Sequence, residues 1–469
     1  MSKRFAWLLG VVALVSIGVL VACGTNYNSS SDGLVLVGSQ GSGLIETFSF
    51  NLNSGSVSAI GNTPADTSGQ TCVLNGVPSS LVVDPKGAYA YTIINANSLC
   101  DTSTSKSATG ILAFKINSDG TTSQVGSLIP FLGETVTIQG TTNSTSAPVV
   151  PGTMVMDTAG KFLFVADRTT TVPPNPPPNT PVLYLPGAVS VFAIGSGGAL
   201  TEVTGSPFFT SSTPPMTLPQ AGLDIISVAP TPTVFPAIGA NGIQNSPCSA
   251  VGLNPPTSQY LYAVDNLGYQ VFEFTVNMTS GVLSYNSGSS LNPASTDALP
   301  VSVGVDPCNR FVYVTGSLNG RMSAYSICNG SATQSATNCP TTPDGSLWPV
   351  TGSPFSLAGS NIDAGALAID PYGNYVYVLG THSNNINIMK IAPVSGALAA
   401  ATPATVNTGT GPTSIAIRGD DNWLFVTNFG SGQVGGTSVS QYAIAPATGA
   451  LTVQQAIQTD NYPWGVAVK

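Results

Sequence analysis

Charged side chains are scarce in this sequence of 469 residues. Asp, Glu, Lys and Arg together make up 7% of it, against about 25% in an average soluble protein. Only 12 residues are Lys or Arg, and the formal net charge is −9. Because nucleic-acid binding needs a basic footprint, this composition argues against a nucleic-acid partner and disfavours a phosphate-rich ligand.

The sequence also lacks the short motifs of several common enzyme classes. It contains no HExxH, no GxSxG and no cysteine-rich metal-binding spacing. It has no CxxC pair that would support a redox role. His382 is the only histidine, and a lone histidine in a loop is most often a solvated residue. We therefore predict no metal site and no cofactor.

Glycine, proline and apolar residues are abundant instead. The chain has 51 Gly and 36 Pro, and 42% of its residues are hydrophobic. The apolar residues come in short runs separated by turn residues, which is typical of an all-β fold and not of a disordered chain.

The N-terminus resembles the signal peptide of a bacterial lipoprotein. Lys3 and Arg4 precede an apolar stretch over 5–20, and Leu20-Val21-Ala22-Cys23 matches a lipobox. We interpret 1–22 as the signal peptide, Cys23 as the lipidated residue and 23–33 as a flexible tether. Gly24 follows the cysteine, which by resemblance to Gram-negative sorting favours the outer membrane. The alternatives are an ordinary signal peptide or one transmembrane helix.

One unit recurs along the rest of the chain. It consists of a short apolar strand that often starts with Pro, an Asp-Pro-x-Gly-type turn, a second strand, a loop, an alternating third strand, a Gly turn and a weaker fourth strand. Six starts are visible, at 78–93, 151–167, 247–265, 300–316, 364–380 and 412–428. Four strands per unit and a period near fifty residues describe the blades of a β-propeller.

The two ends of the chain complete one further unit. Residues 33–60 contain a second, third and fourth strand but no first one. YPWGVAVK, at 462–469, is a first strand with no partner nearby in sequence, and its Pro463 matches Pro300 and Pro412. We predict that strand 463–468 closes the ring. The fold is then an all-β, seven-bladed propeller of four-stranded antiparallel blades, in a single domain over 34–469.

These repeats resemble the YVTN-repeat β-propellers and the related seven-bladed lactonase family, which includes 6-phosphogluconolactonase-like proteins. The residues that carry the resemblance are Tyr313-Val314-Thr315-Gly316, Phe425-Val426-Thr427-Asn428 and Tyr377-Val378-Leu379-Gly380, with the Asp84-Pro85-Lys86-Gly87 and Asp370-Pro371-Tyr372-Gly373 turns. The resemblance covers nearly all of the chain after the tether. It implies the propeller fold, and it transfers no catalytic residue.

The two edges of such a ring differ in their residues. We call the edge with the turns between first and second strands the turn rim. The Asp residues of these turns, Asp84, Asp157, Asp306 and Asp370, are expected to accept hydrogen bonds from turn amides. We call the opposite edge, with the loops after second strands and the linkers between blades, the loop rim. The long insertions 133–150, 169–186 and 209–246 are expected there, where loops often carry binding function.

The loop rim carries the candidate site residues. As catalytic candidates for lactone hydrolysis, which needs a base and an oxyanion-stabilising group, the sequence offers Asp167, Arg168, Asp265 and His382. Candidate binding residues on the same rim are Asn95, Asn266 and Asn428.

Six cysteines remain after Cys23, and an exported protein can pair them as disulfides. Cys72 and Cys100 lie on the loop rim, so a Cys72–Cys100 bridge is one expectation. Cys328–Cys339 would close a long loop on the turn rim, and Cys308 is an alternative partner of Cys328. Cys248 has no assigned partner.

Two functions are consistent with this sequence. The first is a lipid-anchored, monomeric binding or scaffold propeller that engages a glycan, a peptide or an envelope protein through its loop rim. The second is a lactonase-like hydrolase that acts on a neutral sugar lactone at the channel mouth. An enzyme needs ionisable groups that converge on one pocket, whereas a binding module needs a broad neutral-polar surface, which this composition favours.

Overall fold

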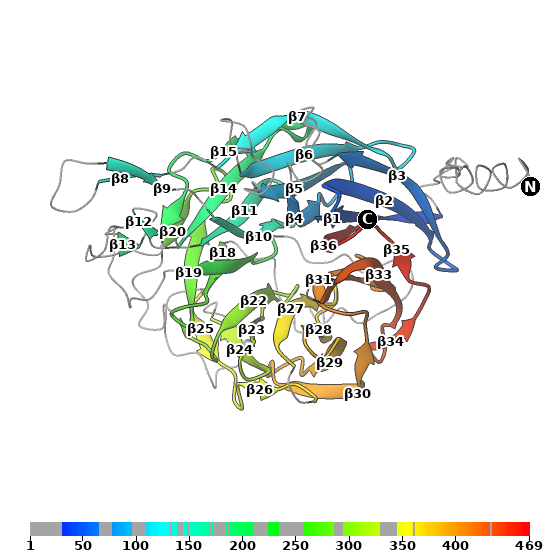
Figure 1. The fold of residues 1–469 in the computed structure, drawn as a ribbon. Coiled ribbons are helices and arrows are strands. Elements are labelled where there is room, and N and C mark those ends of the chain that lie inside the picture. The colour runs from blue at the N-terminus through cyan, green and yellow to red at the C-terminus, as the bar shows by residue number, and fades with distance from the viewer. Residues whose placement is uncertain are drawn as a thin grey trace, which may run out of the picture.

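The sequence repeats fold into a ring of antiparallel sheets in a computed structural model of the chain (Figure 1). The structure describes residues 31–64, 77–95, 109–131, 134–137, 144–147, 150–168, 171–172, 183–184, 187–209, 224–233, 258–285, 294–328, 345–359, 362–431 and 434–469. The signal peptide, Cys23 and nearly all of the tether lie outside these residues. No helix in this described part is long and apolar enough to cross a membrane.

The first four blades each contain four main strands, named in order from the inner to the outer strand. Blade one is β36 (Pro463–Val468), β1 (Asp32–Ser39), β2 (Leu44–Asn51) and β3 (Val57–Pro64). Blade two is β4 (Val77–Val83), β5 (Tyr89–Asn95), β6 (Gly110–Ile116) and β7 (Thr122–Pro130). Blade three is β10 (Val150–Met156), β11 (Phe162–Arg168), β14 (Ala188–Ile194) and β15 (Leu200–Glu202). Blade four is β17 (Ile225–Pro230), β18 (Gln259–Asp265), β19 (Gln270–Val276) and β20 (Leu283–Tyr285).

The remaining three blades follow the same plan. Blade five is β22 (Pro300–Val305), β23 (Phe311–Gly316), β24 (Arg321–Ile327) and β25 (Leu347–Pro349). Blade six is β27 (Ala364–Ile369), β28 (Tyr375–Gly380), β29 (Asn385–Ile391) and β30 (Leu398–Asn407). Blade seven is β31 (Pro412–Ile417), β32 (Trp423–Ser431), β33 (Val434–Ala445) and β34 (Ala450–Val453).

Short elements decorate this ring. A second outer strand pairs with the third strand of four blades: β16 (Phe208–Phe209), β21 (Ala294–Ser295), β26 (Phe355–Ser356) and β35 (Ile457–Gln458). A 3₁₀ turn, η1 (Ser196–Gly198), precedes β15. Two small separate hairpins are β8 (Glu134–Thr137) with β9 (Ser144–Ala147), and β12 (Thr171–Val172) with β13 (Leu183–Tyr184).

Ring closure by the C-terminal strand is confirmed. Strand β36 pairs antiparallel with β1, from Val35 opposite Val468 to Ser39 opposite Pro463. Figure 1 shows the red C-terminal strand beside the blue N-terminal ones. The sheet begins at Asp32, two residues before the predicted start of the domain at 34.

The hydrophobic core lies between the blades. The buried apolar residues form seven clusters, and each cluster joins two neighbouring blades. The cluster between blades seven and one contains Phe50, Phe425 and Val466, so the seam where the termini meet is packed like the other interfaces. Second strands are covered on both faces, which explains why they read as continuous apolar runs.

The recurring tyrosine of the second strand links adjacent blades. The hydroxyls of Tyr262, Tyr313 and Tyr377 donate to the backbone oxygens of Gly345, Gly396 and Gly449, at 2.7, 3.0 and 3.1 Å. Each acceptor lies in the turn before the fourth strand of the next blade. The motif on which the family resemblance rests is therefore structural at these positions.

The aspartates of the turn rim are structural too, as predicted. The carboxylate of Asp157 accepts from the amides of Lys161 and Phe162 at 2.6 and 2.8 Å. Asp370 accepts from the amides of Asn374 and Tyr375 at 2.6 and 3.2 Å. The carboxylates of Asp84 and Asp306 accept equivalent bonds from the amides of Ala88 and Arg310, four residues along the chain.

The predicted start of blade four is wrong. Its inner strand is β17, and the segment from 247 to 257, which was expected to supply it, lies outside the described residues. By strand register Ile225-Ile226-Ser227-Val228-Ala229 corresponds to Pro412-Thr413-Ser414-Ile415-Ala416, and both share a small-apolar-small end, Ser-Val-Ala and Ser-Ile-Ala. β17 pairs with β18, so the chain from 231 to 258 connects a first strand to a second strand. The predicted insertion 209–246 is therefore not wholly a linker between blades three and four.

Two buried cysteines of blade five are disulfide-bonded in the structure, Cys308 and Cys328. The amide of Ile327 donates to the oxygen of Arg310 at 2.8 Å, which brings the end of β24 beside the turn that holds Cys308. This placement favours Cys308 over Cys339 as the partner of Cys328. Cys72, Cys100, Cys248 and Cys339 lie outside the described residues.

We expect non-reducing peptide mapping to recover a Cys308–Cys328 linked pair. The two positions are 20 residues apart in the sequence, and closing a loop of about that size stabilises a fold by about 3 kcal/mol. A Cys308→Ala/Cys328→Ala double variant should lose about that much in chemical denaturation. Recovery of a Cys328–Cys339 peptide would contradict this pairing.

Candidate functional site

The predicted catalytic residues Arg168 and Asp265 meet in one network on the loop rim. Arg168, at the end of β11, donates from Nε and Nη2 to the two carboxylate oxygens of Asp224, both at 2.9 Å. The amide of Asp224 donates to Oδ1 of Asp265 at 3.1 Å. This pairing raises the pKa of Arg168, with the hydrogen bonds that it donates to Asp224 as the main cause. These bonds connect the end of blade three to the linker into blade four.

The two predicted acids of this rim are buried. Asp265 is fully buried and accepts a second amide bond, from Leu267 at 3.1 Å. Asp167 is 4% exposed, and its Oδ2 accepts from the hydroxyl of Ser190 at 2.6 Å. Neither carboxylate is presented to solvent as a general acid or base would be.

The asparagines expected to bind a ligand serve mainly the fold. Asn266 donates to the backbone oxygen of Pro300 at 2.8 Å, across to blade five. Asn428 is 2% exposed and is held by the hydroxyls of Ser438 and Ser440 and by the amide of Gly409. Asn95 is half-buried at the end of β5.

His382 lies away from the other candidates, in the loop between β28 and β29 of blade six. Its Nδ1 is 2.8 Å from Oδ2 of Asp363, the residue just before β27. The two side chains are 76% and 38% exposed. The four catalytic candidates therefore do not converge: three lie around blades three and four, and the fourth lies in blade six.

The His382–Asp363 pair lines a pocket of about 840 Å³ on the loop rim between blades five and six. The loop after β23 supplies Ser317, Leu318, Asn319 and Gly320, and the linker into blade six supplies Leu357 and Ile362. Leu318 is 65% exposed, so an apolar side chain stands in water at the pocket. A volume of this size is in the range of small-ligand sites.

The pocket lining contains no Lys or Arg among the described residues. Arg321, the nearby cation of blade five, donates from Nε and Nη2 to Asp297, both at 2.9 Å. Asn319 donates to the same carboxylate at 3.1 Å. The surroundings are neutral-polar and apolar, with one imidazole and one carboxylate.

The sequence did not predict Asp363, Leu318 or the pocket as parts of a site. One signal was available: the register of β27 with β28 places Ala364 opposite Gly380, so the residue before a first strand lies near those after the second. Applied to His382, this rule would have pointed to Asp363. No sequence pattern could have shown that the loop of blade five closes the other side of the pocket.

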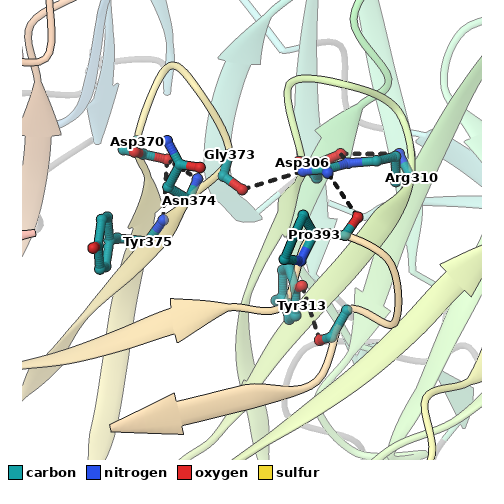
Figure 2. Close-up of polar contacts among 9 residues, drawn as sticks. Asp306, Arg310, Tyr313, Asp370, Gly373, Asn374, Tyr375 and Pro393 are labelled. Atoms are coloured by element: carbon teal, nitrogen blue, oxygen red, sulfur yellow. Dashed lines mark hydrogen bonds and ion pairs between the residues drawn. The ribbon is translucent and has the colours of Figure 1, made fainter. Parts of the chain in front are cut away.

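The turn rim holds a different set of charges (Figure 2). Arg310 is 3% exposed and donates to both carboxylate oxygens of Asp306, at 2.9 and 2.7 Å. It also reaches blade six, with donations to the backbone oxygens of Pro393 at 2.9 Å and Gly373 at 3.1 Å. Within the described residues, no group of three or more His, Cys, Asp or Glu side chains is placed to hold a metal ion.

Solved structures with the same architecture identify the fold. A Pseudomonas aeruginosa periplasmic gluconolactonase aligns over 93% of this chain and 99% of its own, at 18% identity and a TM-score of 0.58. Two Bacteroides proteins named as candidate 6-phosphogluconolactonases also align. The one from B. fragilis covers 94% of this chain and 99% of its own, at 17% identity and a TM-score of 0.62. The one from B. uniformis covers 94% and 100%, at 18% identity and a TM-score of 0.60.

This chain is a seven-bladed propeller similar to the lactonase-like propellers. At these identities the similarity shows the fold alone. No protein-family model and no curated protein sequence matches the chain. Its function must therefore be argued from its own residues.

Proposed function

We propose that this protein is a lipid-anchored envelope propeller that binds a neutral ligand through its loop rim, at the pocket between blades five and six. The observation that carries the proposal is that most ionisable side chains of the loop rim are bound to other protein groups. Arg168, Asp224 and Asp265 are joined in one buried or half-buried network, and Arg321 is bound to Asp297. These groups serve blade contacts, and apart from the His382–Asp363 pair the pocket lining is neutral-polar and apolar.

The pocket supports a ligand without phosphate. A phosphoryl group is normally held by Arg, Lys or a cluster of backbone amides, and the described lining residues include neither Arg nor Lys. A neutral saccharide fits the lining better, since hydroxyls can bond to Asn319 and His382 while Leu318 covers an apolar face. An uncharged segment of an envelope peptide or protein is the other expected type of partner.

The anchoring part of the proposal rests on the sequence. Lys3, Arg4, the apolar stretch and Cys23 have the order of a lipoprotein signal. The related P. aeruginosa protein is named as periplasmic, which is a compartment consistent with export. We propose an outer-membrane lipoprotein that is tethered through Cys23 and is monomeric.

A pair of matched variants tests the binding site. Leu318→Ser alters the pocket, and Val394→Ser alters an equally exposed apolar residue on the turn rim, where Val394 is 71% exposed. On an array of neutral oligosaccharides, Leu318→Ser should weaken binding by about tenfold to a hundredfold, because a buried Leu contact is worth about 1.5–3 kcal/mol. Val394→Ser should bind like the natural protein. Equal loss in both variants would contradict the proposal, and so would the absence of binding both to neutral saccharides and to uncharged peptides.

A lactonase activity is the second candidate, and one observation favours it. The Asp363 carboxylate orients the imidazole of His382, as a general base is oriented in many hydrolases. His382 would take a proton from the attacking water, and the pocket would hold a neutral sugar lactone. The described lining offers no cation to stabilise the oxyanion, which is why binding ranks first.

A further inference from the structure

The turn of blade seven carries an acidic residue at a position where three other turns carry glycine and the turn of blade five carries Asn309, with a φ of 59°. In blades two, three and six the fourth turn residue is Gly87, Gly160 or Gly373, each with a positive φ of 64–70°. In blade seven the residue at this place is Asp421, with a φ of 58°. Asp is one of the few residues with a side chain that adopt this left-handed conformation, so what distinguishes this turn is the carboxyl group that it carries.

The side chain at this turn position is directed at the preceding blade. A Cβ placed on Gly373 of blade six would lie 2.3 Å from Oδ1 of Asp306 in blade five. A Cβ on Gly160 would lie 3.0 Å from Pro85 of blade two. By the same repeat, Asp421 of blade seven is directed at the turn of blade six, where Asp370 lies. Electrostatic repulsion between Asp421 and Asp370 agrees with this placement.

Both carboxyl groups are buried with oxygens left over. Asp370 is 0% exposed and Asp421 is 1% exposed. Among the described residues, Oδ2 of Asp370 and both carboxylate oxygens of Asp421 have no hydrogen-bond partner. Two ionised carboxylates in such a place would be costly, because solvent is excluded and only Oδ1 of Asp370 is compensated, by the amides of Asn374 and Tyr375.

The neighbouring interface shows what usually balances the charge. Between blades five and six, Arg310 follows Asp306 by four residues and neutralises it (Figure 2). Four residues after Asp370 the chain has Asn374, which is uncharged. The blade six–seven interface thus has a second carboxyl group where its neighbour has glycine, and an amide where its neighbour has arginine.

We propose that Asp370 and Asp421 form a proton-holding carboxyl pair that makes the interface between blades six and seven sensitive to pH. In the folded protein at neutral pH the pair retains at least one proton, which removes one of the two negative charges. When this proton is lost to solvent, two negative charges face each other inside the interface. This proposal is independent of the ligand-binding function.

Some charged groups around the pair disfavour its ionisation, and others favour it. From blade five, Asp306 disfavours ionisation of Asp370, and Arg310 is attracted to Asp370. From blade seven, Asp420 disfavours ionisation of Asp421, and Arg418 is paired with Asp420. Burial is the main cause of the change in both groups: it raises the pKa of Asp370 to about 7 and that of Asp421 to about 8. Tyr372, Tyr375 and Tyr377 of blade six also interact with the pair, and their own pKa values are raised.

The sign of the pH effect follows from these directions. A raised carboxyl pKa means that the folded state binds more protons than the unfolded state, in which Asp titrates near 4. The stabilisation is therefore fully present at low pH and is lost as the pH rises towards about 8. Each such group should increase the unfolding equilibrium constant about tenfold per pH unit within this window.

The test is chemical denaturation of the full mature protein between pH 5 and pH 9, with variants. Asp421→Asn and Asp421→Gly should each remove about one power of ten per pH unit from the slope. Asp84→Asn, at the blade-two position that corresponds to Asp370 and faces no second turn carboxylate of the next blade, is the control and should leave the slope unchanged. An unchanged slope in both Asp421 variants would overturn the proposal.

A second measurement is made on the natural protein and does not depend on the stability of any variant. Infrared difference spectra of the natural protein, titrated from pH 5 to pH 9, should show the carbonyl band of a buried neutral carboxylic acid at neutral pH and its loss towards pH 9. Asp421→Asn should reduce this change wherever it folds, because only Asp370 of the pair then remains to titrate. Absence of the band at neutral pH would overturn the proposal. So would the finding that millimolar Ca²⁺ alone abolishes the pH dependence, since the pair would then hold a metal cation.

Discussion

A chain that lacks residues 462–469 is expected not to form a monomeric propeller. Strand β36 is the inner strand of blade one, and it makes the ladder with β1 from Val35–Val468 to Ser39–Pro463. It also brings Val466 into the cluster with Phe50 and Phe425. Its loss would expose an inner edge of the sheet and the apolar seam between blades seven and one, and such edges pair with other chains.

The expected result is unfolding or oligomerisation, as judged by size-exclusion chromatography with light scattering and by thermal melting. A synthetic YPWGVAVK peptide added to the truncated chain should restore part of the monomeric, folded protein, and a scrambled peptide should not. The single substitution Val466→Asp, at a residue 4% exposed, should mimic the deletion, because it buries an unpaired charge. A truncated chain that stays monomeric with an unchanged melting temperature would contradict ring closure.

The second large effect is expected at Arg310. Its guanidinium is bound to a fully buried carboxylate and to two backbone oxygens of blade six. Arg310→Ala would leave the Asp306 charge buried without its partner, and breaking a buried pair in this way costs about 3–5 kcal/mol. We expect a loss of that size in the free energy of unfolding, measured by chemical denaturation.

Arg321 provides the matched comparison for this experiment. Its guanidinium makes a bidentate pair with Asp297, in a geometry similar to that of Arg310 with Asp306, but the Arg321 side chain is 38% exposed. Exposed pairs contribute about 0–1 kcal/mol, so Arg321→Ala should be nearly neutral. Similar losses in the two variants would show that burial does not decide the strength of these pairs.

The sequence was sufficient for the architecture because the fold repeats. Alternating strands, Asp turns and the second-strand tyrosine recur in register, so the incomplete unit at 33–60 required a first strand from elsewhere in the chain. The same reasoning failed at blade four, where both 224–230 and 247–253 fit the start of a unit. Only strand pairing distinguishes them, and pairing depends on distant partners.

The candidate site was less predictable than the fold. The sequence placed Asp167, Arg168, Asp265 and His382 on the correct rim, but not their partners. Whether a charged group is free or bound depends on the adjacent blade, as Arg168 with Asp224 shows. The Asp370–Asp421 pair depends on the same blade-to-blade contact, which the spacing within one repeat does not reveal.

The most direct test of the account is the hydrolysis of glucono-δ-lactone by the mature protein, followed in a pH-stat. A binding propeller predicts a rate equal to that of buffer alone, and the same rate for His382→Gln and Asp363→Asn. Turnover by the natural protein that either substitution abolishes would contradict the account and would make the His382–Asp363 pair catalytic.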